Sequence, residues 1–221
     1  MLLSFDNIID RAINEKIIHL HQKINNNPFP GFIESVPAYS SLAVFYDTVF
    51  TRRSHPGSAS AFEFVKDYIS DLTKENPAAI AKEKKDITTI AVCYNGEDLE
   101  HVAAVHNLTA NEVIHLHTNE VYHVYMTGFL PGFAYMGTLN EKIATPRKDK
   151  PRLNVVAGSV GIAGGQTGIY PFDSPSGWQV IGTTPLKMFD RTRNDPCLLK
   201  IGDAVRFASI DKDKFEELNA H

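Results

Sequence analysis

The residues best suited to chemistry lie between Gly128 and Gly182, a segment that holds ten of the fourteen glycines of the chain. Within it, the run GSVGIAGGQTG places five glycines in eleven residues. Successive main-chain N–H groups in such a loop are able to surround an anion. The run has neither the Gly-Lys-Ser/Thr ending of a Walker A loop nor the GxGxxG spacing of a dinucleotide fingerprint. We therefore predict a substrate- or nucleotide-binding loop of another geometry, with these contact residues: Gly158, Gly164, Gly165, Gln166, Thr167 and Tyr170. The alternative is that a barrel with many tight turns needs glycine for its turns alone.

Two arginines precede this run, each directly after a proline. Arg147 and Arg152 are five residues apart, so the segment carries two guanidinium groups on a stiffened loop. Arginine presents a planar fork of donors that matches carboxylate or phosphate oxygens. We predict that both arginines clamp an anionic group, the alternative being a solvated charged loop.

The histidines offer two interpretations. His115 and His117 would share one face of an extended segment, and Glu120 follows, which is part of the spacing of a metal site. No second histidine–asparagine half follows downstream, so we expect no metal. His117 is predicted instead to orient substrate or transfer a proton, and His123 to share that role or lie in a strand. No GxSxG elbow or Ser-His-Asp order is present, and Cys93 lies in an apolar run typical of a core thiol. Covalent catalysis is not indicated.

Hydrophobic periodicity predicts a small α+β domain over residues 1–80 and a β-barrel or sandwich over 81–221. The first part contains a helix at 9–24, a hairpin of strands 31–36 and 42–46, and a helix at 58–74. The charged, proline-containing stretch 75–86 is predicted to be a linker. Further elements follow it, and they are a strand at 87–94, a helix at 98–106, a capping box at Thr109 and Glu112, and short strands between glycine and proline turns.

Composition narrows the class of protein. The net charge of −4 argues against nucleic-acid binding, and no apolar run is long enough to span a bilayer. The first ten residues lack the basic region of a signal peptide, and the two cysteines form no CxxC pair. We expect a cytoplasmic protein without a membrane or nucleic-acid partner.

Several ordered motifs together resemble one family along nearly the whole chain. They are Pro37–Leu42 (PAYSSL), Tyr125–Met136 (YMTGFLPGFAYM), Thr145–Arg147 (TPR), Pro151-Arg152, Ala157–Pro171 (AGSVGIAGGQTGIYP), Ser174–Trp178 (SPSGW), Ile181-Gly182 and Gly202–Phe207 (GDAVRF). The family is allophanate hydrolase subunit 1, also described as the sporulation kinase inhibitor and as the B-type subunit of prokaryotic ATP-dependent 5-oxoprolinase. The chain departs from the family at Tyr94–Leu99, where its loop is shorter, and at its start, where a Gly-Asp lead-in is missing.

The resemblance implies a ferredoxin-like amino-terminal domain followed by a cyclophilin-like β-barrel. It also implies a component of an ATP-dependent hydrolase that opens 5-oxoproline to glutamate, inactive alone, with ATP and Mg²⁺ on the assembled complex. The implied partners are a second barrel subunit, like allophanate hydrolase subunit 2 or the C-type subunit of 5-oxoprolinase, and a third 5-oxoprolinase subunit. Arg147, Arg152 and His117 would act on the small-molecule substrate.

Two other functions stay open at this point. One is a regulatory protein that inhibits a sensor histidine kinase, with Phe129, Phe133 and Tyr135 as its docking patch. The other is a subunit that acts on urea- or allophanate-type amides, for which the chain lacks a biotin-accepting motif.

Overall fold

The computed structural model describes residues 1–5, 8–74 and 86–220 and divides the chain into two compact units, Met1–Lys84 and Lys85–His221. Each unit is described by itself. The predicted linker, apart from Asp86, lies outside the described residues. No helix in the described ranges has both the length and the apolarity that a membrane crossing requires.

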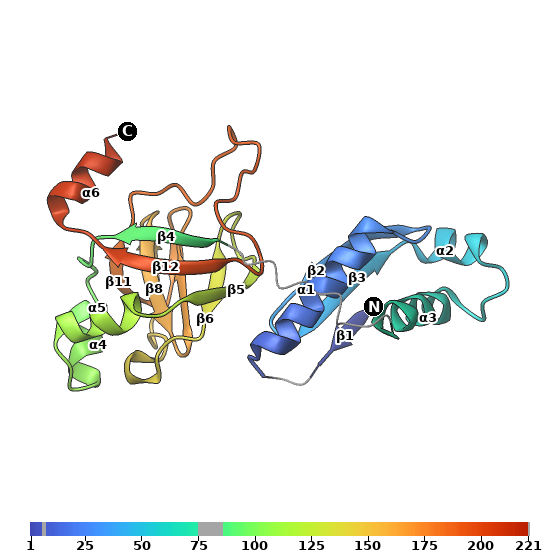
Figure 1. The fold of residues 1–221 in the computed structure, drawn as a ribbon, viewed down its shortest axis with the longest axis horizontal. Helices are drawn as coiled ribbons and strands as arrows, with labels where there is room; N and C mark the ends of the chain where they lie inside the picture. Colours follow the sequence, from blue (N-terminus) through green and yellow to red (C-terminus); the bar gives the residue numbers. More distant parts are fainter. Residues whose placement is uncertain (6–7, 75–85, 221) are drawn as a thin grey trace. The chain divides into compact units, whose positions relative to one another are not determined.

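The first unit is a three-stranded antiparallel sheet, in the order β1-β3-β2, with helices (Figure 1). Its elements are β1 (Leu2–Ser4), α1 (Arg11–Asn26), β2 (Phe32–Pro37), β3 (Ser41–Tyr46), α2 (Thr48–Ser54) and α3 (Ala61–Lys74). The predicted hairpin and both predicted helices are confirmed, with shifted ends, and α2 was not predicted. A ferredoxin-like unit has four strands and two helices. The described residues supply three strands, so that assignment stays a prediction.

Side-chain caps explain where the helices of this unit begin. The Asp10 carboxylate accepts a hydrogen bond from Ile13 N–H at 2.8 Å, so α1 starts at Arg11 rather than at residue 9. Ser60 does the same for Glu63 N–H at 3.0 Å at the start of α3. The short helix α2 begins after Asp47, whose carboxylate accepts from Phe50 N–H. One face of α1 then packs on the sheet and α3 in a core of Ile17, Leu20, Ile24, Phe29, Leu42, Val44, Val65 and Ile69.

The second unit is built around a seven-stranded sheet in the order β11-β8-β9-β6-β5-β12-β4. Its strands are β4 (Ile87–Val92), β5 (Tyr122–Thr127), β6 (Ala134–Gly137), β8 (Ser159–Ala163), β9 (Gln166–Ile169), β11 (Gln179–Thr183) and β12 (Ala204–Ser209). The two edge strands meet just beyond β4, where Cys93 and Thr183 exchange two main-chain hydrogen bonds of 2.8 Å. This bridge brings the sheet close to a closed barrel, which confirms the predicted barrel. The cyclophilin-like assignment stays a prediction.

Helices and a two-stranded ribbon flank the barrel. Figure 1 shows α4 (Leu99–Val105) and α5 (Ala110–Thr118) together beside it, and α4 contacts β11 while α5 contacts β12. The capping box predicted at Thr109 and Glu112 is present at the start of α5. Four further elements in the described residues belong to the unit: a 3-10 turn η2 (Glu141–Ile143), the paired strands β7 (Arg152–Val155) and β10 (Ser174–Ser176), and the helix α6 (Lys212–Asn219).

Candidate functional site

The glycine-rich run forms a hairpin of two paired strands instead of an open loop, and its role in binding stays a prediction. Strands β8 and β9 pair antiparallel from Val160 with Ile169 to Ala163 with Gln166, so the ladder uses their main-chain groups. Gly164 and Gly165 form the two-residue turn, and Gly164 has φ 54°, which suits glycine at the first position of such a turn. The Gly164 N–H donates to Thr145 O at 2.8 Å. The Gly164 N–H is therefore already used within the protein.

The glycines within the strands make room for aromatic rings. A Cβ at Gly168 would lie 2.9 Å from the Phe133 ring and 3.1 Å from Ala134 O. A Cβ at Gly161 would lie 3.3 Å from both Tyr170 and Trp178. The hairpin is glycine-rich because side chains from other segments lie directly on its backbone.

Those side chains form an aromatic cluster on the barrel. Phe133, Tyr170 and Trp178 are almost fully buried, with edge-to-face ring separations of 5.2 Å for Phe133–Tyr170 and 5.7 Å for Phe133–Trp178. The half-buried Tyr135 lies 4.7 Å from Phe133. Tyr170 contributes its ring to this cluster, and its hydroxyl hydrogen-bonds to Ser176. Because Phe133 is buried, the docking patch predicted from Phe129, Phe133 and Tyr135 loses its central member, while Phe129 is 61% exposed.

Arg147 lies over this cluster, with its guanidinium carbon 5.8 Å from the centre of the Trp178 ring. Its main chain is fixed on both sides. Gln179 Nε2 donates to Pro146 O at 2.9 Å, and Lys148 N–H donates to Gly177 O at 2.7 Å. The side chain itself is exposed. It pairs with no carboxylate among residues 1–5, 8–74 and 86–220.

Arg152 has the opposite environment. Its Nη2 lies 2.6 Å from Asp98 Oδ1, and its Nε lies 2.6 Å from Glu97 Oε1. Lys148 Nζ lies 2.6 Å from the same Asp98 oxygen, and Val180 N–H donates to Asp98 Oδ2 at 2.7 Å. Burial raises the pKa of Asp98, but the hydrogen bonds from Arg152, Lys148 and Val180 outweigh it and hold that pKa below its usual value. Asp98 thus holds two cations as a carboxylate that is only 3% exposed.

Sequence reasoning did not single out Asp98. It directly precedes α4 but makes no side-chain cap hydrogen bond with that helix. An aspartate at a helix start is ordinarily explained as a cap. The pairing of Asp98 with Arg152 could not be read from the sequence, because Arg152 lies 54 residues further along the chain and only the fold brings the two together.

His117 lies inside the barrel unit, on the helix α5 rather than on an extended segment. His115 and His117 therefore do not share a face: His115 is exposed and His117 is fully buried. The His117 Nδ1 lies 2.7 Å from the Tyr94 hydroxyl, and its Nε2 lies 2.9 Å from Thr167 Oγ1. Thr167 Oγ1 donates to Gly161 O at 3.2 Å, so it accepts from His117 Nε2–H, and Nδ1 accepts from Tyr94.

Burial lowers the pKa of His117 to about 3, so the ring is neutral near pH 7. Both ring nitrogens have partners within the protein, and the ring stacks on Phe207 at 4.4 Å. The predicted role of His117 toward substrate stays a prediction, and in this conformation its side chain does not reach the surface. No group of three or more His, Cys, Asp or Glu side chains within the described ranges is placed to hold a metal ion.

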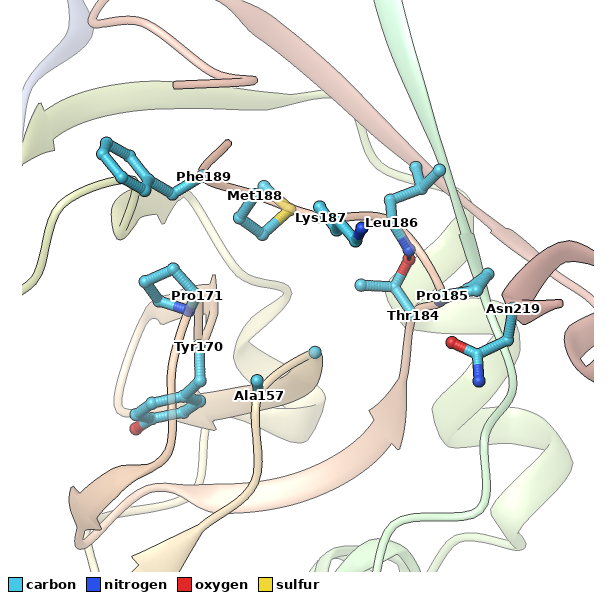
Figure 2. A pocket seen from close by; sticks show the side chains of 11 residues that line it. Ala157, Tyr170, Pro171, Thr184, Pro185, Leu186, Lys187, Met188, Phe189 and Asn219 are labelled. Atoms are coloured by element: carbon cyan, nitrogen blue, oxygen red, sulfur yellow. Dashed lines mark hydrogen bonds between the residues drawn. The ribbon is translucent and has the colours of Figure 1, made fainter. Parts of the chain in front are cut away.

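Two more of the predicted residues, Gly158 and Tyr170, line a small hollow in the barrel unit. Figure 2 shows Thr184 to Phe189 along one side of it and Tyr170, Pro171 and Ala157 along the other, with Asn219 of α6 at one end. Gly158 also lines it, and its N–H donates to Tyr170 O at 2.7 Å. Its volume is about 160 Å³, below the roughly 300–1,000 Å³ of ordinary ligand pockets.

The structure thus distributes the predicted site over four places. Gly158 and Tyr170 line the hollow, Gly164, Gly165 and Gln166 form the hairpin tip, and His117 and Thr167 are internal. Arg147 and Arg152 lie near Trp178, and Arg152 Nη1 donates to Trp178 O at 3.4 Å. The Arg147–Trp178 surface carries an exposed guanidinium without a carboxylate partner in the described residues, which is a chemistry suited to an anion.

The chain thus combines a small α/β unit with a following β-barrel unit, and this combination can be compared with known protein families. The chain belongs to the family described as carboxyltransferase domain, subdomain C and D, whose model matches residues 1–199. Within that class it is 45% identical over 222 residues to the B-type subunit of 5-oxoprolinase from Bacillus subtilis (strain 168), covering 97% of this chain and 91% of that protein. It is 38% identical over 210 residues to the B-type subunit of 5-oxoprolinase from Escherichia coli O157:H7, covering 94% and 90%. These similarities confirm the family resemblance.

Solved structures share the fold. The crystal structure of TTHA0988 superimposes with a TM-score of 0.82 at 33% identity, over 96% of this chain. The chain spans 40% of the length of TTHA0988. The crystal structure of Kluyveromyces lactis urea carboxylase superimposes with a TM-score of 0.72 at 17% identity. The match covers 98% of this chain and 21% of the urea carboxylase chain. At this identity the similarity shows a shared fold alone.

Proposed function

We propose that this chain is the B-type subunit of an ATP-dependent 5-oxoprolinase, a hydrolase that opens 5-oxoproline to glutamate. The observation that carries the proposal is the 45% identity over nearly the full length of both chains to a 5-oxoprolinase subunit of that type. The contacts around Arg147 are consistent with a subunit that binds an anionic substrate. The surface offers a cation over an aromatic ring, which is suited to binding a small anionic substrate.

The chemistry explains why such a subunit needs partners. An unstrained lactam resists water because its amide is stabilised by resonance. Phosphorylation of the carbonyl oxygen by ATP, with Mg²⁺ as counter-ion, would convert that oxygen into a leaving group. In the glycine-rich hairpin of this chain, the strand ladder and the Gly164 N–H to Thr145 O contact already use main-chain groups that a phosphate-binding loop would need. We therefore propose that this chain binds and orients the carboxylate of 5-oxoproline, and that ATP is bound elsewhere in the complex.

Reconstitution tests the proposal. The chain is mixed with the second barrel subunit and the third subunit of a 5-oxoprolinase, and release of glutamate and ADP from 5-oxoproline and ATP is measured. We expect turnover by the complete mixture and none by this chain alone. A complete mixture that stays inactive, or a single chain that turns over, would contradict the proposal.

Kinase inhibition is the second candidate, and the exposed Phe129 favours it. Phe129 is 61% exposed and has φ 70°, a left-handed conformation that is costly for a bulky residue. An exposed aromatic held in this way suits a protein contact. Loss of histidine kinase autophosphorylation on adding this chain, restored with Phe129→Ala, would support the inhibitor. The urea- or allophanate-type alternative has the support of the fold alone.

A further inference from the structure

The two arginines that follow prolines differ in what their guanidinium groups have left to bind. Arg152 is engaged on two sides, by Asp98 and by Glu97, and its side chain is 19% exposed. Arg147 is exposed and pairs with no carboxylate in the described part of the chain. A guanidinium that already holds two carboxylates has little left to offer a ligand, whereas an unpaired one keeps its full fork.

The loop that carries Arg147 is held rigidly to the barrel. The Gln179 side chain donates to Pro146 O, and Lys148 N–H donates to Gly177 O, so the main chain is held on either side of Arg147. Further along, Lys148 Nζ and Arg152 Nη2 both lie 2.6 Å from Asp98. Between Pro146 and Lys148 the backbone is therefore fixed, while the Arg147 side chain is exposed and has no carboxylate partner in the described residues. A rigid backbone with a free charged group loses little entropy when a ligand binds.

The charges of Asp98, Lys148 and Arg152 also distinguish Arg147 from Arg152. The buried carboxylate of Asp98 lies between the positive charges of Lys148 and Arg152, and together with Glu97, 2.6 Å from Arg152 Nε, it compensates them. The charge of Arg147 has no carboxylate partner in the described residues and lies over the ring of Trp178, which itself contacts the rings of Tyr135 and Tyr170. An anion at this place meets a cation on an aromatic surface that excludes part of the surrounding water, which strengthens their attraction.

We propose that Arg147 is the arginine that binds the anionic oxygens of the ligand, and that Asp98 is a positioning residue that holds Lys148 and Arg152 so that Arg147 is presented. The inference rests on the proposed function for the identity of the ligand, the carboxylate of 5-oxoproline. The anion site itself requires carboxylate or phosphate oxygens only. Arg152 then stabilises the loop and does not touch the ligand.

The chain contains its own reporter for the test, because Trp178 is its single tryptophan. The full chain is titrated with 5-oxoproline, acetate and inorganic phosphate while tryptophan fluorescence is followed, and calorimetry on the same samples measures affinity independently. We expect saturable binding that Arg147→Lys weakens about ten- to a hundredfold, because one ammonium cannot replace a bidentate fork. Arg152→Lys should keep the affinity within about threefold and lower the melting temperature.

The positioning role of Asp98 must be tested with a measurement that does not depend on the stability of the fold. At a temperature where the variant is fully folded, Asp98→Asn should weaken anion binding about three- to tenfold. In the reconstituted complex it should raise KM for 5-oxoproline more than it lowers kcat. Asp149→Asn, which removes an exposed carboxylate from the same loop, is the matched control and should leave both unchanged.

The outcomes separate this inference from the proposed function. Phosphate or acetate binding that depends on Arg147, without tighter binding of 5-oxoproline, keeps the anion site and removes the proposed substrate. Binding weakened as much by Arg152→Lys as by Arg147→Lys would overturn the inference. So would wild-type affinity in Arg147→Gln, or no saturable binding of any of the three probes.

Discussion

Asp98 carries an unusual electrostatic load for a single buried residue. It accepts hydrogen bonds from Arg152, Lys148 and Val180 N–H, and it lies 3% exposed. Removal of one partner from a buried ion pair leaves the other charges without compensation, which costs more than the pair contributes. The cost is moderated here because Lys148 is 28% and Arg152 19% exposed. Asp98 thus holds the side chains of Lys148 and Arg152 close together, although their like charges would otherwise repel.

We predict that Asp98→Ala lowers the free energy of unfolding by about 2–4 kcal/mol. Asp98→Asn should cost less, because its amide oxygen still accepts from Val180 N–H. Urea unfolding followed by Trp178 fluorescence measures both. The contribution should be present above about pH 4 and be lost as pH falls through the lowered pKa of Asp98. Asp149→Asn is the control, and an Asp98→Ala variant as stable as this control would contradict the account.

His117 is the second residue whose charge state matters to the fold. Its pKa of about 3 in the folded chain compares with about 6.5 for an unburied histidine. Between these values the unfolded chain binds a proton that the folded chain does not. Folding stability therefore falls as pH falls through this window, and it is fully present above about pH 6.5.

We predict that the stability advantage of the wild type over His117→Gln shrinks by about 1.4 kcal/mol per pH unit between about pH 6 and pH 4. Urea unfolding at half-unit pH steps measures this difference. His115→Gln, an exposed position two residues earlier on α5, should keep wild-type stability at pH 7. A wild-type advantage over His117→Gln that does not change with pH would show that the buried ring is not held neutral.

At the scale of elements, the β8–β9 hairpin shows how packing determines glycine content. Gly161 and Gly168 lie on strands whose surfaces are covered by Phe133, Tyr170 and Trp178. Gly164 lies at the turn with φ 54°, and no other atom lies within 4 Å of a Cβ placed there. The same residue type therefore has a steric role in the strands and a conformational role at the turn.

We predict that Gly168→Ala lowers the free energy of unfolding by about 1–3 kcal/mol, because its Cβ would approach the fixed Ala134 O to 3.1 Å and the Phe133 ring to 2.9 Å. Near-ultraviolet circular dichroism should also change, since the Phe133 ring packs on Trp178. Gly165→Ala is the matched control within the same hairpin and should stay within about 0.5 kcal/mol of the wild type. Equal stability of the two variants would contradict this steric explanation.

The sequence is informative where local rules decide and uninformative where distant segments meet. Helix α1, the β2–β3 hairpin and the capping box at Thr109 follow from periodicity and caps, and all three are predictable. The glycine density of the Gly158–Gly168 run predicts a loop, whereas the aromatic rings that require glycine in strands come from elsewhere in the chain. Local composition contains no information on such contacts.

The candidate site divides in the same way. Arg147 and Arg152 share one dipeptide motif, so the sequence treats them alike, and only the fold places Asp98 beside Arg152 and Trp178 beneath Arg147. The spacing of His115 and His117 would place both rings on one face only if the segment were extended, and the structure shows a helix there. The capping box upstream indicates a helix there, and with it the separation of the two rings.

At the scale of the whole molecule, each of the two units has a core of its own. The barrel buries twenty apolar side chains in its main cluster, and the Cys93–Thr183 bridge joins the edges of its sheet. The first unit buries a separate cluster between α1, α3 and its sheet. Units with separate cores and their own ladders are expected to fold and unfold as separate cooperative transitions.

We therefore predict that a fragment of residues 85–221 folds alone, with a melting temperature within about 5 °C of the barrel transition in the full chain. Trp178 is the single tryptophan, so its fluorescence follows the barrel unit selectively, while far-ultraviolet circular dichroism follows both units. In the full chain the two signals should give separate midpoints, and the fragment should reproduce the fluorescence midpoint. The fragment should also keep the anion affinity of the full chain, because Asp98, Arg147, Arg152 and Trp178 all belong to it. A fragment that unfolds without cooperativity, or melts more than about 10 °C below the full chain, would show that the barrel depends on the first unit for its stability.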